Sequence, residues 1–260
     1  MKNEKTCLVT GGAKRIGSVI CNELAKDGWN VAIHYNKSEH ESKILEKKIK
    51  NLGKNSISIQ ADFNTFTHNE MFLGLINNVE EKLGPISLLV NNAAVFNFDS
   101  PDSTTLNQMK FHLSNNLIAP IMLTKALYQL RKTAKFDLTT SAVINLLDQK
   151  LWNTNPDFFS YTLSKSALNE ATVLMAKSFA PYLRVLGVAP GITLPVENQN
   201  ENDFENAHTK TPLKKSSTPI DIADAIVWLS KAKAITGTTL IVDGGQHLIP
   251  SERDVVFMKS

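Results

Sequence analysis

The 260-residue sequence has only two cysteines, no low-complexity tract and no apolar run long enough to span a bilayer. The cysteines, Cys7 and Cys21, are too few for a disulfide framework and indicate a reducing compartment. A few polar residues lead straight into an apolar stretch, without the basic region, apolar region and cleavage site of a secretion signal. We therefore expect a cytoplasmic protein that does not bind a membrane.

Metal ligands and a strong charge of one sign are also lacking. The six histidines are scattered without ligand spacing and no cysteine pair accompanies them, so we expect no metal. The 28 basic and 25 acidic residues leave a net charge of only +3. One basic cluster alternates with apolar residues at helical spacing and indicates a solvated helix face: Lys43, Lys47, Lys48 and Lys50. Nucleic-acid binding is not expected.

What is present is a repeated alternation of short apolar runs and longer amphipathic stretches. The runs predict seven strands at residues 6–10, 30–35, 56–61, 86–91, 142–147, 184–189 and 238–242. Nearly continuous apolar strands separated by helices are typical of a parallel sheet that is covered on both faces. We predict an α/β, Rossmann-type, doubly wound seven-stranded parallel sheet. With no linker or internal repeat, residues 1–260 are expected to form one domain.

Residues 192–217 have the weakest periodicity and contain a strongly polar stretch. They follow the sixth predicted strand, and open α/β sheets bind ligands beyond the carboxyl ends of their strands. Long polar insertions at such places are often lids or mobile binding loops. We expect this segment to be a substrate loop that closes over the ligand.

A glycine-containing turn at residues 10–17 joins the first strand to the first helix. Its small residues would let the backbone approach a pyrophosphate, whose charge is favoured at the helix N-terminus. The residues that we expect to contact the cofactor here are Gly11, Lys14, Arg15 and Ile16. Such a turn is weak evidence by itself, because glycines at strand-to-helix turns often have only a steric role.

The end of the second strand indicates which dinucleotide binds. The sequence there is Tyr35, Asn36, Lys37 and Ser38, without the acidic residue that binds the ribose 2′-hydroxyl of NAD. Arg15 and Lys37 would attract a 2′-phosphate, so NADP(H) is the expected cofactor. Lys37 could also be a plain surface lysine, and Ser38 with Glu41 predicts a capping box, which is compatible with phosphate binding.

Tyr161 and Lys165 lie four residues apart in a segment, 160–180, that predicts a long helix, so both side chains share one face. An ammonium near a phenol stabilises the phenolate. We therefore expect Lys165 to lower the pKa of Tyr161, which would make Tyr161 a better proton donor near neutral pH. A tyrosine and a lysine at this spacing also occur by chance in many helices.

Together with their context, these motifs resemble the short-chain dehydrogenase/reductase family along nearly the whole chain. The matching pieces follow the family's order and spacing: the turn at 10–17, Asp62, residues 91–94, Asn116, Tyr161 with Lys165, Pro190 with Gly191, and residues 243–245. The resemblance implies that Asp62 touches the adenine, that Asn91, Asn92 and Ala93 line the cofactor, as do Pro190 and Gly191, and that Lys165 holds the nicotinamide ribose. It also implies that Asn116 supports a proton-relay water. Asn92 could instead cap a strand end, and Asn115 competes with Asn116.

One position departs from the usual family pattern. Asp148 stands where the family usually has a serine that polarises a carbonyl. An ionised aspartate would oppose an oxyanion, whereas an acid beside a tyrosine can supply the proton that a C=N nitrogen gains with hydride. Alternatively, Asp148 only ends the strand and pairs with a lysine such as Lys150.

Asp148, Arg15, the end of the second strand and Phe96 resemble the pteridine reductase and dihydromonapterin reductase branch of the family. That resemblance implies that Phe96 stacks on the pterin, although an aromatic side chain can also be ordinary core. Ala94 departs from the branch, since protozoan pteridine reductases have a serine there. The segments from Pro219 and at residues 246–260 resemble parts that pack between subunits, which implies a homotetramer or a homodimer.

We therefore predict hydride transfer from NADPH to the C=N bond of a dihydropteridine or dihydrofolate, giving the tetrahydro form. In this hypothesis Tyr161 donates the proton, Lys165 tunes it, Asp148 assists and Asn116 orders water. One alternative is a general NADPH-dependent carbonyl or 3-oxoacyl reductase in which Asp148 has no special role. Another is a non-catalytic NADP(H)-binding regulator, a use to which this fold is also put, although a regulator would not need Tyr161.

Overall fold

A computed structural model describes residues 5–133, 141–195 and 201–257 of the protein. Its centre is a seven-stranded, all-parallel sheet in the order β3-β2-β1-β4-β5-β6-β7. The strands are β1 (Thr6–Val9), β2 (Asn30–Tyr35), β3 (Ser56–Gln60), β4 (Ile86–Asn91), β5 (Ala142–Leu146), β6 (Arg184–Pro190) and β7 (Thr239–Val242). This confirms the predicted fold class, and each predicted strand is found to within a residue at either end.

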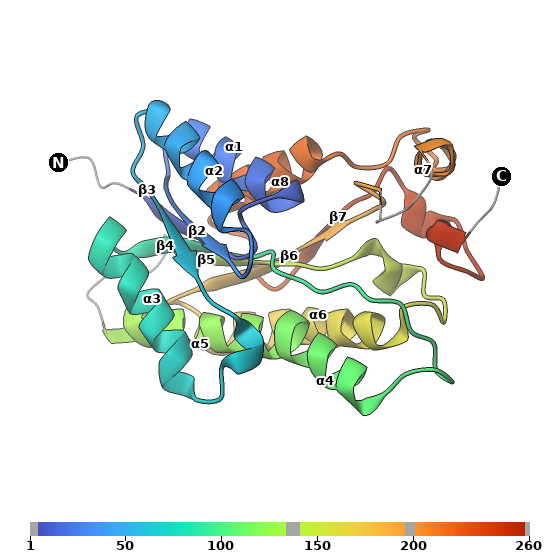
Figure 1. Ribbon diagram of the computed structural model, residues 1–260, viewed down its shortest axis with the longest axis horizontal. Coiled ribbons are helices and arrows are strands. Elements are labelled where there is room, and N and C mark those ends of the chain that lie inside the picture. Colours follow the sequence, from blue (N-terminus) through green and yellow to red (C-terminus); the bar gives the residue numbers. More distant parts are fainter. Residues whose placement is uncertain (1–4, 134–140, 196–200, 258–260) are drawn as a thin grey trace.

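Helices cover both faces of the sheet (Figure 1). One face carries α1 (Arg15–Lys26), α2 (Glu39–Asn51) and α8 (Pro219–Lys231). The other carries α3 (Asn69–Leu83), α4 (Leu106–Leu113), α5 (Ala119–Thr133) and α6 (Phe159–Phe179). Strands β1, β2 and β4 are buried almost throughout because each is covered from both sides. That double coverage explains why they read as continuous apolar runs rather than alternating ones.

Two irregular turns shape the carboxyl edge of the sheet. Between α4 and α5 the chain forms a π-helical turn, Ser114–Ile118, which moves its side chains out of the regular helical register. After β5 a 3₁₀ turn, Gln149–Trp152, is capped by Asp148, whose side chain accepts from the backbone N–H of Lys150. Both turns adjoin the amino-terminal half of α6, where Tyr161 and Lys165 lie.

The segment predicted as a substrate loop is partly helical, since α7 occupies Glu201–Thr209. Residues 196–200 of that segment lie outside the described residues. Near the end of the chain, a short 3₁₀ turn at Val255–Phe257 contacts α7, so these two late segments lie side by side. In the described ranges of the chain, no helix is both long and apolar enough to cross a bilayer.

The predicted capping box at the start of α2 is wrong. Ser38 is the N-cap residue, but its hydroxyl makes no capping hydrogen bond. Its backbone, at φ −96° and ψ 56°, lacks the extended conformation that aims an N-cap oxygen at the first turn. Ser38 instead borders the large cavity described next.

Candidate active site

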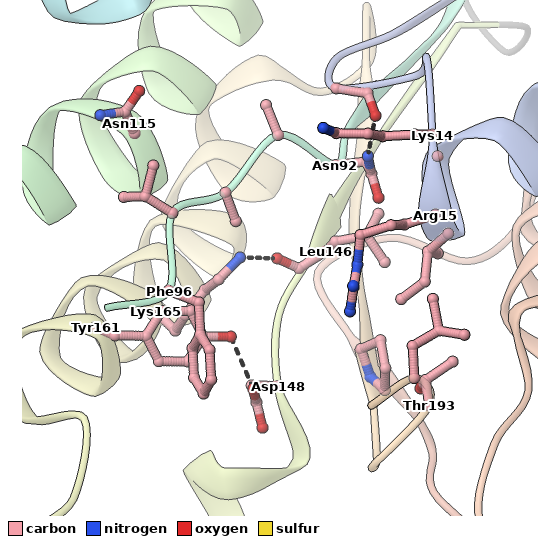
Figure 2. A pocket seen from close by; sticks show the side chains of 18 of the residues that line it. Lys14, Arg15, Asn92, Phe96, Asn115, Leu146, Asp148, Tyr161, Lys165 and Thr193 are labelled. Carbon is pink, nitrogen blue, oxygen red and sulfur yellow. Dashed lines mark hydrogen bonds between the residues drawn. The ribbon is translucent and has the colours of Figure 1, made fainter. Parts of the chain in front are cut away.

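A cavity of about 580 Å³ opens at the carboxyl edge of the sheet and runs from the glycine turn to Tyr161. It lies at the carboxyl ends of the paired strands β1 and β4, where the chain after β1 and the chain after β4 lead to helices on opposite faces of the sheet, the place at which open α/β sheets bind ligands. Figure 2 shows Arg15 and Thr193 on the side of the cavity that faces Tyr161 and Asp148.

The glycine turn is built for close approach of the backbone. A Cβ added to Gly17 would lie 2.2 Å from the carbonyl oxygen of Gly11, and Gly11 itself has a positive φ of 60°. Arg15 also has a positive φ, 53°, although it carries a side chain. That conformation is unfavourable for residues other than glycine, and the turn nevertheless keeps an arginine there. Of the residues predicted to bind the cofactor, Gly11, Lys14, Arg15 and Ile16 all line the cavity.

His34, which the sequence interpretation did not single out, anchors this turn. The backbone N–H of Gly11 donates to His34 Nδ1 over 3.0 Å, so the ring proton is on Nε2, which faces the carbonyl of Ala61 at 3.1 Å. Burial lowers the pKa of His34 to about 4 and keeps the ring neutral. Its ring also stacks on Phe63 at 4.5 Å between centroids. A histidine inside an otherwise apolar strand was the only signal in the sequence.

The residues after β2 line the same end of the cavity: Tyr35, Asn36, Lys37 and Ser38. Together with Arg15 they bring positive charge and no carboxylate to this edge. Asp62, which the resemblance assigns to the adenine, borders a smaller neighbouring depression rather than the main cavity. Its carboxylate accepts from the backbone and side-chain nitrogens of Asn64, which lowers its pKa.

The three residues predicted to line the cofactor after β4 have different positions. Asn92 and Ala93 line the cavity, and the Asn92 amide donates to the carbonyls of Thr10 and Gly11. Asn91 instead lies in the core, 2% exposed, where its amide donates to Asn145 Oδ1 over 2.8 Å. At the far end of β6, Pro190 and Gly191 line the cavity as predicted.

The two neighbouring asparagines of the π-helical turn also differ. Asn115 lines the cavity and exchanges hydrogen bonds with Asn64. Asn116 is fully buried, and its amide accepts from the backbone N–H of Val95 and donates to the Val95 carbonyl and to Ser164. The side chain of Asn116 therefore holds the segment after β4 in place.

Tyr161, Asp148 and Lys165 come together at the other end of the cavity (Figure 2). The Tyr161 hydroxyl donates to Asp148 Oδ2 over 2.7 Å, and the Lys165 ammonium donates to the Leu146 carbonyl over 2.6 Å. Burial raises the pKa of Asp148 and lowers that of Lys165 to about 8. The sequence left open an ion pair between Asp148 and the Lys150 side chain. The structure instead has a hydrogen bond from the backbone N–H of Lys150 to Asp148.

The expected lowering of the pKa of Tyr161 is wrong for the protein without ligand. Burial, and next the negative charge of Asp148, raise the pKa of this phenol well above its usual value. The sequence argument counted only Lys165, whose ammonium lies 5.8 Å from the centre of the Tyr161 ring. Asp148 is closer to the hydroxyl and has the opposite effect on the phenolate.

Phe96 borders the cavity beside Tyr161. Its ring stacks on Phe158 with centroids 4.0 Å apart and meets the Tyr161 ring edge-on at 4.7 Å. With 38% of its surface exposed, Phe96 presents one apolar face to the cavity. Phe158 was not predicted; it holds the left-handed N-cap position of α6, which no sequence pattern indicated.

The end of the chain supplies a further wall that sequence reasoning missed. Asp254, Val255 and Val256 line the cavity. Asp254 forms an ion pair with Lys150 at 2.8 Å, and both side chains are largely buried. Across the cavity mouth, the Arg15 guanidinium donates to the carbonyl of Pro195, which joins the glycine turn to the segment after β6.

Within the described residues, no three His, Cys, Asp or Glu side chains are grouped so that they could hold a metal ion. The site instead combines a glycine turn at a helix N-terminus, a cationic segment after β2 that contains no carboxylate, and a buried tyrosine, aspartate and lysine. Residues 11–247 match a family model described as enoyl-(acyl carrier protein) reductase. The chain belongs to the short-chain dehydrogenase/reductase family and is an oxidoreductase.

Among solved structures, the protein is similar to FolM alternative dihydrofolate reductase 1 from Brucella canis, crystallised with NADP. The two are 37% identical, with a TM-score of 0.86 over 94% of this chain and 95% of that one. It is also similar to pteridine reductase 1 of Leishmania tarentolae, 29% identical over 93% of this chain and 96% of the relative. The 3-oxoacyl-[acyl-carrier-protein] reductase FabG of Staphylococcus aureus is 30% identical over 95% of this chain and all of the relative.

Proposed function

We propose that this protein uses NADPH to reduce the C=N bond of a dihydropteridine, such as dihydrobiopterin, dihydromonapterin or dihydrofolate, to the tetrahydro form. The observation that carries the proposal is the hydrogen bond from the Tyr161 hydroxyl to the buried carboxyl of Asp148. Two similar proteins, the Brucella FolM enzyme and the Leishmania pteridine reductase, have names that point to the same substrates.

The residues of the cavity fit NADP(H). A Cβ at Gly11 or Gly17 would collide with neighbouring protein atoms, so these glycines keep the turn tight, and both border the cavity, where a pyrophosphate could meet the backbone at the start of α1. The positive charges of Arg15 and Lys37 suit a 2′-phosphate, and the end of β2 brings no carboxylate to repel it. When bound, the cofactor would supply the hydride. Asn92, Ala93, Pro190 and Gly191 would lie along it.

The other end of the cavity, formed by Tyr161, Asp148 and Lys165, would supply the proton. A C=N nitrogen becomes an amine when the carbon gains hydride, so it needs one proton from the protein. Burial raises the pKa of Asp148, which lets this carboxyl hold a proton at a higher pH than an exposed aspartate. Asp148 and Tyr161 share a hydrogen bond and can pass that proton along it. The Lys165 ammonium supports the negative charge that the pair carries afterwards.

The substrate space suits a flat ring. Phe96 offers an aromatic face beside Tyr161, and Val95, Val255 and Val256 add apolar walls. A planar heterocycle would pack against the Phe96 ring and place a ring nitrogen near Asp148. Ala94 lines the same space without a hydroxyl, so this chain would bind the ring with one hydrogen bond fewer than a serine would allow.

The test is NADPH oxidation by the purified protein with the three dihydropteridines, offered beside a panel of ketones and with NADH as the comparison cofactor. We expect turnover of at least one dihydropteridine and a preference for NADPH. The Asp148→Ser variant should lose about 100-fold or more in kcat with a dihydropteridine. Unchanged dihydropteridine turnover in that variant would contradict the role of Asp148.

A second candidate is an NADPH-dependent 3-oxoacyl or carbonyl reductase, which the 30% identity to FabG favours. In that case only ketones would be reduced, and Asp148→Ser would maintain or improve their reduction, because a serine hydroxyl can donate to the developing oxyanion. The same two classes of substrate, dihydropteridines and ketones, and the same variant therefore separate the candidates. If Tyr161→Phe bound NADPH and kept the full biological function, a non-catalytic regulator would be the better explanation.

We also infer a homo-oligomer. Large apolar side chains are exposed on α4, α6 and α8 and near the end of the chain, among them Leu106, Leu163, Leu174, Trp228 and Leu248, which are 41–69% exposed. Exposed apolar side chains of this size on helix surfaces favour contacts between subunits. Light scattering of the purified protein should give a dimer or a tetramer, and a monomer would contradict the inference.

A further inference from the structure

A buried polar cluster lies behind Tyr161, outside the cavity. It contains His112 of α4, Ser160 at the start of α6, and Asp99 from the segment between β4 and α4. All three are at most 1% exposed, and none of them lines the cavity. Because no substrate can reach this cluster, the pairing of a histidine with a serine here has no nucleophilic role.

The hydrogen bonds of His112 indicate its tautomer, that is, which ring nitrogen carries the proton. The backbone N–H of Asn97 points at Nε2 over 3.2 Å, and a backbone N–H can only donate, so Nε2 accepts. The proton of the neutral ring is therefore on Nδ1, which donates to Ser160 Oγ over 2.7 Å. Burial lowers the pKa of His112, against the opposing charge of Asp99, and so favours this neutral ring.

Asp99 holds the start of α6. One carboxylate oxygen of Asp99 accepts from the backbone N–H of Ser160 over 3.0 Å. The backbone carbonyl of Asp99 accepts from the backbone N–H of Phe159 over 3.1 Å. The first N–H groups of a helix have no partner within the helix. The N-cap residue Phe158 makes no side-chain cap, so Asp99 serves this helix from a distant part of the chain. Its second carboxylate oxygen accepts from the Thr104 hydroxyl over 2.8 Å.

The cluster joins the two sides of the substrate space. Asn97, which donates to His112, directly follows Phe96 in the chain. Ser160, which accepts from His112, directly precedes Tyr161. The rings of Phe96 and Tyr161 are 4.7 Å apart, and the His112 ring lies 6.3 Å from that of Tyr161. A shift of either segment would therefore change the distance between the proton donor and the aromatic face.

We propose that His112 and Asp99 are positioning residues that fix Tyr161 relative to Phe96. His112 has a separate bond for each side: its Nε2 holds the segment that carries Phe96, and its Nδ1 holds the helix that carries Tyr161. The proposal rests on the proposed function, in which Phe96 binds the pterin ring and Tyr161 takes part in proton transfer. It predicts that substrate binding depends on His112 Nε2, through Phe96, and that proton transfer depends on His112 Nδ1, through Tyr161.

The test compares three substitutions at His112 by steady-state kinetics with NADPH and a dihydropteridine. His112→Leu removes both bonds and should raise KM and lower kcat, each by about tenfold, because small displacements of reacting groups are costly. His112→Gln places an amide oxygen near the position of Nε2 and should restore KM more than kcat. His112→Asn places an amide nitrogen near the position of Nδ1 and should restore kcat more than KM. The exposed His68→Gln serves as the matched control.

A purely structural role would give a different result. If His112 only stabilised the fold, KM and kcat would both stay within about twofold of the wild-type values once active sites were counted by NADPH binding. That outcome, or an equal recovery of both constants in the Gln and Asn variants, would overturn the proposal. The affinity for NADPH should be unchanged in all three, because the cluster is remote from the glycine turn.

A second measurement separates this proposal from the proposed function. Nitrogen-15 spectra of histidine-labelled protein report the tautomer of His112 without any substrate. We expect a neutral ring with its proton on Nδ1, assigned by comparison with His112→Gln; a proton on Nε2 or a charged ring at pH 7 would overturn the positioning role. If the wild-type protein reduced only ketones, the substrate assignment would fail, and the same split of KM and kcat would then be sought with the best ketone.

Discussion

The Tyr161 hydroxyl donates to the carboxylate of Asp148 over 2.7 Å, while the Lys165 ammonium lies 5.8 Å from the centre of the Tyr161 ring. An anion and a cation thus act on one phenol from different distances (Figure 2). The anion opposes the phenolate and the cation favours it, so the charge states of Asp148 and Lys165 decide when Tyr161 can exchange a proton.

The first prediction concerns pH. The pKa of Lys165 is lowered to about 8 by burial, so the ammonium is charged below about pH 8 and neutral above it. A neutral Lys165 cannot stabilise the negative charge that proton transfer leaves on Tyr161 and Asp148. We therefore expect kcat/KM to fall as the pH rises through about 8. In Lys165→Arg the guanidinium stays charged throughout the measured pH range. The decrease in the remaining kcat/KM at alkaline pH should therefore disappear or occur at a higher pH.

A second prediction concerns acid stability. His34 has a pKa of about 4 in the folded chain, below its ordinary value of 6.5. The unfolded chain therefore takes up the proton first, and folding free energy is lost as the pH falls from about 6.5 to about 4, by on the order of 3 kcal/mol. Urea unfolding at several pH values measures the loss. In His34→Asn the amide oxygen can still accept from Gly11 without titrating, and an equal acid loss in that variant would show that His34 is not its source.

The third prediction concerns Arg15, whose backbone conformation lowers the stability of the fold while its guanidinium contributes to NADPH binding. A residue other than glycine at a φ of 53° costs about 1 kcal/mol, so Arg15→Gly should be more stable than Arg15→Ala by about that amount. Both variants lack the guanidinium and should bind NADPH about tenfold more weakly. Thermal unfolding and NADPH titration measure the two effects. NADPH affinities that differ between the variants would mean that strain, rather than charge, governs binding.

The fourth prediction tests the cradle of the glycine turn. In Gly17→Ala the new methyl group would collide with the carbonyl of Gly11, and we expect a loss of about 2–3 kcal/mol together with weak NADPH binding. Gly74 of α3 is exposed, and a Cβ there meets nothing within 4 Å. The matched Gly74→Ala variant should therefore be neutral or up to about 1 kcal/mol more stable, with normal NADPH binding. Equal effects of the two substitutions would exclude a tight turn at Gly17.

The fifth prediction concerns the wall that the end of the chain builds. Lys150 is 4% exposed and Asp254 13%, so Lys150→Met leaves a largely buried carboxylate unpaired and should cost about 3 kcal/mol. The double variant with Asp254→Asn should recover much of this loss. A double-mutant cycle by chemical unfolding gives the coupling energy, and additive losses would mean that the pair contributes nothing. The KM for the dihydropteridine should rise in Lys150→Met, since Asp254 borders its space.

Periodicity was sufficient to predict the sheet because its central strands, such as β1, β2 and β4, are buried on both faces, which leaves continuous apolar runs in the sequence. The glycine turn, Tyr161 with Lys165, and Asp148 were recognisable for a related reason: each is a local pattern at fixed spacing. Local patterns did not indicate that the side chains of Asn91 and Asn116 turn into the core, since nothing in the chain says which way a polar side chain points at the carboxyl edge. Both amides serve buried segments rather than face the cavity.

The sequence by itself determined the fold class, the family and the place of the cofactor turn, because these depend on residue spacing along one strand or one helix. Only the tertiary structure decided that Asp148 meets the Tyr161 hydroxyl, that Asp254 closes the cavity, and that His112 joins Phe96 to Tyr161. These contacts connect residues 13 to 104 positions apart in sequence, or act through a third residue. Their energies arise from burial and hydrogen-bond geometry, which exist only after the segments have packed together.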